Sequence, residues 1–222
     1  MNERYDLELT SAYLRGYAML HGLPQPEGAA PEQLEAYAQE REIRLHYFKR
    51  QEELPRVRWA LGFLRGVAPE SLLDVGSGRG VFLLPFLRQF PGVPVTSLEL
   101  REDRAELLRA LALGGGLPLT VLRQDVCAWD DGPEDGFDCV CALEVLEHIP
   151  QVEQAVRQLV RLARRWVVVS VPSKPDNNPE HIHLLTKARL TELFEAAGCG
   201  RLRFDAVPDH LVMTASTGRR GT

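Results

Sequence analysis

The chain has 222 residues, of which 45% are hydrophobic and 26% are charged, and its formal net charge is −5. This length fits one domain with a modest extension, the composition excludes a disordered or fibrous chain, and the acidic balance disfavours a large nucleic-acid-binding surface. Because there is no apolar leader, no apolar run of about 18 residues and no zinc-type spacing of the four cysteines, we expect a cytoplasmic protein with reduced thiols and no membrane contact.

The first 68 residues are predicted to form a helical extension. Apolar residues at helical spacing indicate a helix over residues 7–20, which glycines and prolines at 22–28 end. Pro31 favours the start of a second helix that runs toward Leu54, and residues 57–67 form a third. The chain is therefore expected to divide near residue 68.

Residues 69–222 alternate between strand-like and helix-like segments. The predicted strands are residues 71–75, 95–100, 119–123, 137–143, 166–171, 202–207 and 211–216. The predicted helices are residues 80–90, 102–113, 150–164 and 186–197, with a kink expected at Pro85. This alternation predicts an α/β fold with a doubly wound, mostly parallel, seven-stranded sheet. The last two strands follow each other without a helix, which indicates an antiparallel edge hairpin.

A glycine-rich loop, Asp74-Val-Gly-Ser-Gly-Arg-Gly80, follows the first predicted strand. Glycines let the backbone turn tightly and approach a ligand closely. The order G-x-G-x-G differs from the G-x-G-x-x-G of most dinucleotide sites. Asp74 would repel a pyrophosphate, but it can accept hydrogen bonds from an ammonium group. The loop therefore favours a cationic ligand over a polyphosphate.

Two further acids follow the next two predicted strands. Glu99 ends the second strand, where a carboxylate can hold both hydroxyls of a ribose. Asp125 follows the third, where it suits a contact with the exocyclic amine of adenine, although a helix-capping role is an alternative. Together with Asp74, these acids predict a pocket for a cationic nucleoside.

These residues resemble the class I S-adenosylmethionine-dependent methyltransferases over residues 71–217. The resemblance implies a Rossmann-like domain, here residues 69–222, that binds S-adenosylmethionine and releases S-adenosylhomocysteine. It also implies that residues 1–68 form a lid over the acceptor, with aromatic side chains that line the pocket or anchor the helices: Tyr13, Tyr17, His46, Tyr47 and Phe48. The implied cofactor-binding residues are Asp74, Gly76, Ser77, Gly78, Glu99, Leu100, Asp125, Val126, Leu143 and Glu144.

The run Glu144-Val-Leu-Glu-His148 also resembles this family, where a similar run follows the fourth strand. The preferred interpretation is metal-free, with His148 and Glu147 as the catalytic candidates because a histidine titrates near neutrality. The alternative is a divalent-metal site, as the resemblance to ubiquinone-biosynthetic O-methyltransferases and small-RNA ribose 2′-O-methyltransferases implies. Its ligands would be Glu144, Glu147, His148 and His183, with His181 nearby.

The expected activity is in-line methyl transfer to a small-molecule acceptor, which mainly requires alignment and exclusion of water. An RNA acceptor is a less favoured alternative. A nicotinamide-dependent oxidoreductase is disfavoured by the loop pattern and by the lack of a Tyr-x-x-x-Lys pair, and a non-catalytic nucleoside-binding module stays open. The acceptor, the acceptor atom and the oligomeric state are not indicated by the sequence.

Overall fold

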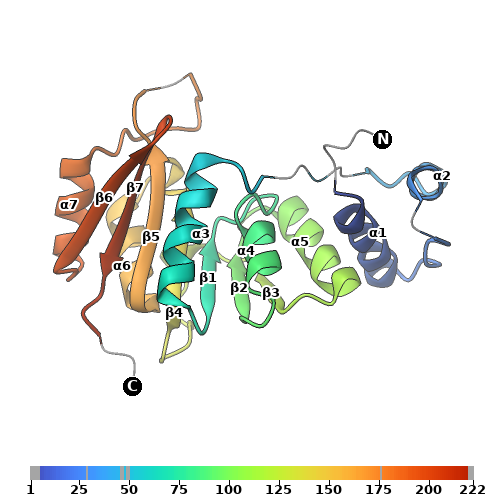
Figure 1. Cartoon of the computed structure of the whole chain (residues 1–222), viewed down its shortest axis with the longest axis horizontal. Coiled ribbons are helices and arrows are strands. Elements are labelled where there is room, and N and C mark those ends of the chain that lie inside the picture. Colours follow the sequence, from blue (N-terminus) through green and yellow to red (C-terminus); the bar gives the residue numbers. More distant parts are fainter. Residues whose placement is uncertain (1–5, 29, 46–47, 49–50, 176, 220–222) are drawn as a thin grey trace.

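The computed structural model describes residues 6–219 except residues 29, 46–47, 49–50 and 176. Within these residues seven strands form one sheet in the order β3-β2-β1-β4-β5-β7-β6 (Figure 1). The strands are β1 (Leu72–Val75), β2 (Val95–Leu98), β3 (Leu119–Leu122), β4 (Phe137–Leu143), β5 (Ala163–Pro172), β6 (Arg201–Val207) and β7 (His210–Ser216). The predicted seven-stranded α/β sheet is confirmed.

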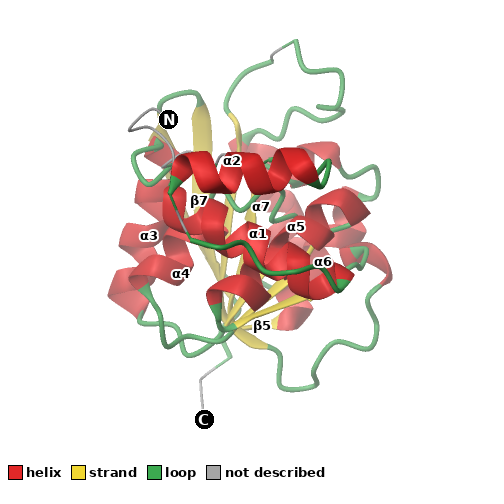
Figure 2. Ribbon diagram, turned by 90° about the vertical axis from the view of Figure 1, so that its right-hand side faces the viewer, coloured by secondary structure: helices red, strands yellow, loops and turns green. Residues whose placement is uncertain are grey.

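Helices cover both faces of the sheet. The α-helices are α1 (Leu7–His21), α2 (Pro31–Glu40), α3 (Pro55–Val67), α4 (Leu83–Gln89), α5 (Glu102–Gly115), α6 (Val152–Leu162) and α7 (Lys187–Ala196), and two short 3-10 helices are η1 (Val126–Ala128) and η2 (Leu146–His148). Helices α3, α4 and α5 pack on one face, and α6 and α7 on the other (Figure 1). Helices α1 and α2 lie beyond α5 and are nearest the viewer in Figure 2.

The sheet is parallel from β3 through β5 and antiparallel at its other edge. Strand β1 pairs in parallel with β2 and β4, whereas β7 pairs antiparallel with both β5 and β6. The turn between β6 and β7 contains Asp209, whose φ of 65° is tolerated better by aspartate than by most residues. The predicted antiparallel edge hairpin is therefore confirmed.

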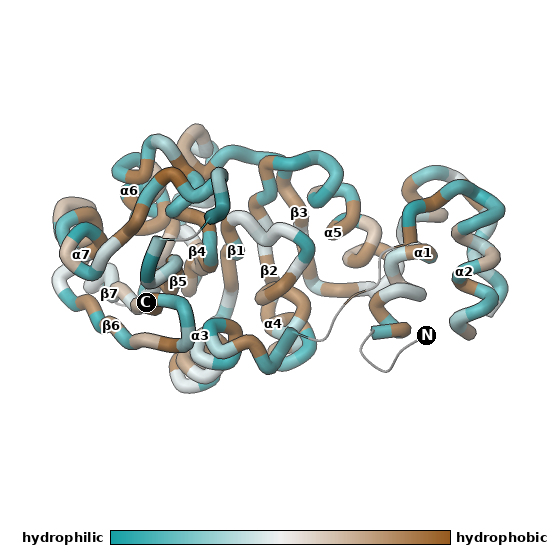
Figure 3. Tube along the Cα trace, turned by 90° about the horizontal axis from the view of Figure 1, so that it is seen from above, coloured by the Kyte–Doolittle hydropathy of each residue, from teal (hydrophilic) through white to brown (hydrophobic). Residues whose placement is uncertain are grey.

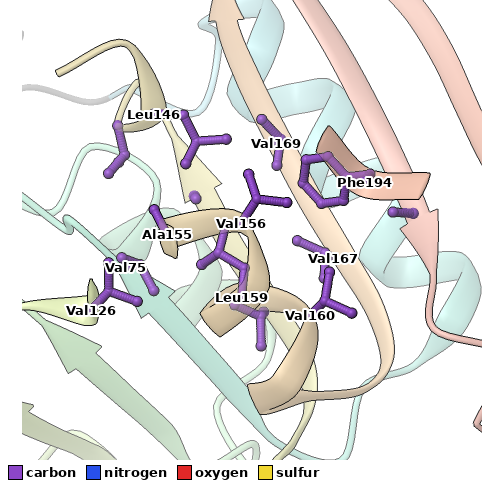
Figure 4. Packing of buried hydrophobic residues seen from close by; sticks show 14 of the residues in the cluster. Val75, Val126, Leu146, Ala155, Val156, Leu159, Val160, Val167, Val169 and Phe194 are labelled. Atoms are coloured by element: carbon purple, nitrogen blue, oxygen red, sulfur yellow. The ribbon is translucent and has the colours of Figure 1, made fainter. Parts of the chain in front are cut away.

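The buried strands give the sheet two apolar faces, and brown segments are most frequent along β1, β2 and β3 in the hydropathy colouring of Figure 3. Helix α6 illustrates the packing: its apolar residues recur at helical spacing and contact the sheet, where Val167 and Val169 of β5 lie (Figure 4). Each buried Val or Leu contributes about 1.5–3 kcal/mol relative to an exposed one. The buried residues of α6 are Val152, Ala155, Val156, Leu159, Val160 and Leu162.

Helix α1 packs closely against α5 because glycines stand at the contact. A Cβ added at Gly16 would lie 1.8 Å from the carbonyl oxygen of Ala110, and one at Gly114 would lie 2.0 Å from that of Ala12. Either distance is far below van der Waals contact, so no larger residue fits at this separation of the helices. Helix α1 is thus attached to the sheet domain through α5, whereas α3 packs on the sheet itself.

Two sequence predictions about helices are wrong. The second helix ends at Glu40 instead of running toward Leu54, because Glu42 adopts a left-handed φ of 54° and the amide of Ile43 bonds back to the carbonyl of Ala38. The fourth helix begins at Leu83 instead of residue 80, so Pro85 lies in its first turn, where proline is tolerated. The amides on either side of it still bond back by four residues, from Leu84 to Gly80 and from Phe86 to Phe82.

Candidate active site

A pocket of about 160 Å³ lies at the carboxyl ends of β1 and β4. Gly76 has a φ of 67°, and a Cβ added there would lie 2.7 Å from a methyl group of Val145, so the loop needs glycine at this point. The residues that line the pocket are Arg56, Val57, Asp74, Gly76, Ser77, Gly78, Val81, Phe82, Leu143 and Glu144. Of the predicted cofactor-binding residues, six therefore meet here.

Asp74 is the buried carboxylate of this pocket. Its side chain is 3% exposed, and among the described residues its Oδ2 has no hydrogen-bond partner. Burial raises the pKa of Asp74 to about 7, opposed by a hydrogen bond with Ser77 and assisted by the negative charge of Glu99. A buried carboxylate oxygen without a partner is costly, and an ammonium group in the pocket would satisfy it.

Glu99 binds the glycine loop to the end of β2. Its Oε2 accepts a hydrogen bond from the amide of Gly78 at 2.8 Å, and its Oε1 accepts one from the amide of Arg101 at 2.9 Å. The hydroxyl of Ser97 also donates to that of Ser77 at 2.7 Å, and the hydroxyl of Ser77 donates to the carbonyl of Asp74. Because each carboxylate oxygen can accept a second hydrogen bond, Glu99 can hold the loop and still bind a ribose diol.

The predicted adenine-contacting residues lie farther along the sheet edge. Asp125 is exposed, and its Oδ1 caps η1 by accepting a hydrogen bond from the amide of Cys127 at 2.8 Å. Val126 is 4% exposed and Leu100 is 62% exposed. Asp125 therefore has the helix-capping role that was the alternative prediction, and its second oxygen can still accept a hydrogen bond from a ligand.

Glu144 also lines the pocket, but both of its carboxylate oxygens contact other side chains of the protein. It has a left-handed φ of 60°, and its Oε1 accepts a hydrogen bond from the hydroxyl of Ser170 at 2.7 Å. Its Oε2 lies 3.0 Å from Nε2 of His210, whose Nδ1 is 2.9 Å from the carbonyl oxygen of Pro208. The sequence analysis missed His210, because no local pattern shows that the β6–β7 turn reaches the end of β4.

Glu147 and His148 belong to a second cluster, which the structure completes with His181. Their ligand atoms all lie within 4.8 Å of one another, and the side chain of Glu147 is fully buried. Nδ1 of His148 donates to the carbonyl of Glu180 at 2.9 Å, which leaves Nε2 as the acceptor or metal-binding nitrogen of a neutral ring. The rings of His148 and His181 are 4.7 Å apart.

The cluster differs from the four-ligand set proposed from the sequence. His183 is turned away, with its Nε2 3.0 Å from the carbonyl oxygen of Ile149, and Glu144 is held by Ser170 and His210. The amides of Ile182 and His183 bond to the carbonyl of Glu147, which fixes the loop that carries His181. The structure thus groups Glu147 and His148 with His181.

Four pocket residues were not singled out from the sequence. Arg56 and Val57 begin α3, and Val81 and Phe82 follow the glycine loop. Val81 and Phe82 could have been predicted from the sequence, since residues directly after a glycine-rich loop stay near its ligand. Arg56 could not, because nothing local places the start of α3 beside β1.

The sheet order, the glycine loop after β1 and the acids at the ends of β1 and β2 define the architecture of the class I methyltransferases. The chain belongs to the methyltransferase-domain family, whose family model matches residues 41–201. The predicted membership of the methyltransferase family is therefore confirmed.

Curated relatives share part of the chain. A ubiquinone biosynthesis O-methyltransferase of Photorhabdus laumondii is 28% identical over 109 residues, which are 49% of this chain and 45% of the relative. One of Sodalis glossinidius is 30% identical over 99 residues, 45% of this chain and 39% of the relative. The chain therefore matches less than half the length of these relatives.

Solved structures share the fold. A 1,6-didemethyltoxoflavin-N1-methyltransferase of Burkholderia thailandensis has a TM-score of 0.60 at 24% identity, covering 86% of this chain and 91% of that one. A methyltransferase of Aquifex aeolicus has a TM-score of 0.62 at 18% identity, covering 75% and 92%. Among the described residues, no helix is both long and apolar enough to cross a membrane.

Proposed function

We propose that this chain transfers the methyl group of S-adenosylmethionine to a hydroxyl oxygen of a small-molecule acceptor. The observation that carries the proposal is Asp74, a buried carboxylate with an oxygen that lacks a partner among the described residues, beside a glycine loop. The choice of oxygen follows the two curated relatives described above, both named O-methyltransferases.

The residues present fit this cofactor. Asp74 would hold the ammonium of the methionine part, and the guanidinium of Arg56 lies in the same pocket, where it would bind the carboxylate. Glu99 would hold the ribose, and Asp125 with Val126 would frame the adenine. Leu143 and Glu144 would then face the reacting end, since they line the pocket from β4.

The cofactor supplies an activated sulfonium methyl group, so the protein has to align the acceptor and exclude water. We place His148 near this region because η2, which carries it, follows the end of β4 by only two residues. Its Nε2 is the candidate proton acceptor for the substrate hydroxyl, since Nδ1 is held by the carbonyl of Glu180. Glu147, 4.0 Å from this nitrogen, would orient the ring and stabilise its charged form.

A second candidate function is metal-assisted O-methylation. It is favoured by the cluster of Glu147, His148 and His181, since a buried carboxylate and two imidazoles are a suitable donor set for a divalent ion. The carbonyl of Glu180 orients His148 as metal-binding histidines usually require. A bound ion would lower the pKa of the acceptor hydroxyl, and Glu147, His148 and His181 would hold it.

The helical extension is proposed to cover the acceptor. The start of α3 already lines the cofactor pocket through Arg56 and Val57. Tyr13 and Phe48 are buried against each other, with ring centroids 6.2 Å apart, so they anchor the extension. His46 and Tyr47 lie outside the described residues. RNA as the acceptor has no specific support in the structure, and a small molecule remains the proposal.

The test measures binding and turnover separately. Calorimetry with S-adenosylhomocysteine and NADH should show binding of the first alone, and methyl transfer from labelled S-adenosylmethionine should occur to a hydroxylated aromatic acceptor such as a catechol. Binding of NADH without S-adenosylhomocysteine would refute the proposal. A parallel assay with a chelator, combined with elemental analysis, tests the role of a metal ion. Unchanged turnover after removal of all metal would eliminate metal-assisted O-methylation.

Glu147→Gln distinguishes the two candidates further. If an ion is bound, this variant should lose it and lose turnover, and added Mn²⁺ or Mg²⁺ at high concentration should partly restore turnover. If His148 acts as a base without metal, turnover should fall less and should ignore added ions. Arg161→Gln, remote from both pockets, is a control for general effects of substitution.

A further inference from the structure

A second pocket lies on the other side of the glycine loop, between α1 and the start of α5. It has a volume of about 150 Å³. The residues that line it are Tyr13, Tyr17, Arg44, Arg79, Asp103, Arg104, Glu106 and Leu107. None of them lines the cofactor pocket described above, although Arg79 belongs to the same loop.

Three arginines line this pocket. Among the described residues, Arg44 and Arg79 form no ion pair with an acid, and Arg104 interacts with the charge of Asp103. Three guanidinium groups in one pocket repel one another, and a bound anion would relieve this repulsion.

The two acids of the pocket offset the charge of the arginines only in part. Asp103 accepts two hydrogen bonds of 3.0 Å from Arg101, and the pKa of Asp103 is lowered mainly by Arg101, with a smaller contribution from Arg104. Glu106 lies 2.7 Å from Nε2 of His21. Each acid thus has a basic partner outside the trio of arginines.

The remaining walls suit a small organic anion. The hydroxyl of Tyr13 is protonated at neutral pH, and burial raises its pKa further, to about 12. The ring of Tyr17 packs against that of His21, with centroids 4.1 Å apart, and gives the pocket a flat apolar side. Guanidinium groups bind phosphate oxygens through paired hydrogen bonds, so three of them fit a phosphate better than a single carboxylate.

We propose that this pocket binds the phosphate group of a small phosphorylated molecule. Arg104 reaches toward the glycine loop, since a Cβ added at Gly78 would lie 3.9 Å from its Nη1. The ligand would therefore lie beside the loop that forms the cofactor pocket, with Arg44 from the extension and Arg104 from α5 on either side. The extension and the sheet domain would both contribute to this site.

The experiment titrates the full-length chain with phenyl phosphate and with pyrophosphate by calorimetry at low ionic strength. Arg44→Gln/Arg104→Gln should weaken binding by about tenfold or more, because two charge-assisted contacts are lost. Arg109→Gln is the matched control: it lies on the same helix, is paired with Glu102 and removes a charge outside the pocket. It should bind within about twofold of the wild type, since one distant charge is largely screened.

A repeat with excess S-adenosylhomocysteine separates this site from the cofactor pocket. Phosphate binding that persists in its presence supports the proposal, and competition between the two would overturn it. Absence of saturable binding, or equal affinity of the double variant and the wild type, would also overturn it. The single variant Arg44→Gln, at an exposed position, keeps the test decisive if the double variant unfolds. Failure of S-adenosylhomocysteine to bind would instead count against the proposed function.

Discussion

The carboxylates at the ends of β1 and β4 differ in how they are satisfied. Asp74, near the end of β1, has a buried oxygen without a partner among the described residues, and its pKa is raised to about 7. Glu144, after β4, is bound by Ser170 and lies 3.0 Å from His210. Asp74 can therefore bind a ligand, whereas Glu144 links β4 to β5 and β7 at the same edge of the sheet. Side-chain type alone does not distinguish them; their partners do.

The largest effect is expected at Asp74. Asp74→Asn should weaken S-adenosylhomocysteine binding by about 100-fold or more, because the ammonium loses a buried charged partner. The same variant should be more stable than the wild type at pH 8, by on the order of 4 kcal/mol, since the charged form of a carboxyl whose pKa rises from 3.8 to about 7 on folding is destabilised in the folded state. Calorimetry and thermal melts measure both quantities.

The control for that gain in stability is Asp138→Asn. Asp138 is equally buried, but it is paired with Arg165 at 2.5 Å and its pKa is lowered, with burial opposing and Arg165 favouring the charged form. Its neutralisation should therefore destabilise the chain. If both variants were destabilised alike, Asp74 would not be the strained, ligand-holding carboxylate that we infer.

The pH dependence of binding is the next largest effect. Below pH 7 Asp74 is mostly protonated in the free chain, so S-adenosylhomocysteine affinity should fall by up to about tenfold per pH unit between pH 7 and pH 5. The sign for folding is opposite: the folded state binds more protons than the unfolded state between about pH 4 and pH 7, so stability falls as pH rises through this window. Calorimetry across this range should show the affinity slope, and Asp74→Asn should abolish it.

The sequence was sufficient to predict those site residues whose position depends only on neighbouring residues in the chain. Asp74 lies near the end of β1, and Gly76 and Glu99 directly follow β1 and β2, so the order of the elements fixes their positions. Fold class and the edge hairpin were predicted for the same reason. The α2 boundary was missed because a left-handed residue, Glu42, ends the helix without a glycine or proline to signal it.

Contacts between distant segments were not predictable. His181 joins Glu147 because the amides of Ile182 and His183 bond to the carbonyl of Glu147, a contact about 35 residues away in sequence. His210 reaches Glu144 from the edge hairpin in the same way. The sequence offered His181 and His183 as two possible ligands. The backbone hydrogen bonds of this loop determine that His181 faces the cluster, whereas His183 bonds to the carbonyl of Ile149.

A smaller effect is expected at Glu144. Glu144→Gln should lower stability by about 1–3 kcal/mol, since the charged hydrogen bond to Ser170 and the contact with His210 are weakened. Binding of S-adenosylhomocysteine should change by less than about threefold, because Glu144 is not expected to contact its charged groups. A double-mutant cycle with His210→Gln, measured by urea unfolding, should give a positive coupling energy. Full additivity would contradict the role that we assign to Glu144.

The smallest effect is expected at Asp125, which combines both behaviours. Its Oδ1 caps η1, and its exposed second oxygen is available to an adenine amine. Asp125→Ala should lower stability by about 0.5–2 kcal/mol through the lost cap. Asp125→Ser restores a capping oxygen but not the second acceptor, so it should recover stability while S-adenosylhomocysteine affinity stays a few-fold weaker. If Asp125→Ser restored both stability and affinity, Asp125 would affect the cofactor only through the backbone that it caps. Asp74 and Glu99 would then be the acids that contact the cofactor directly.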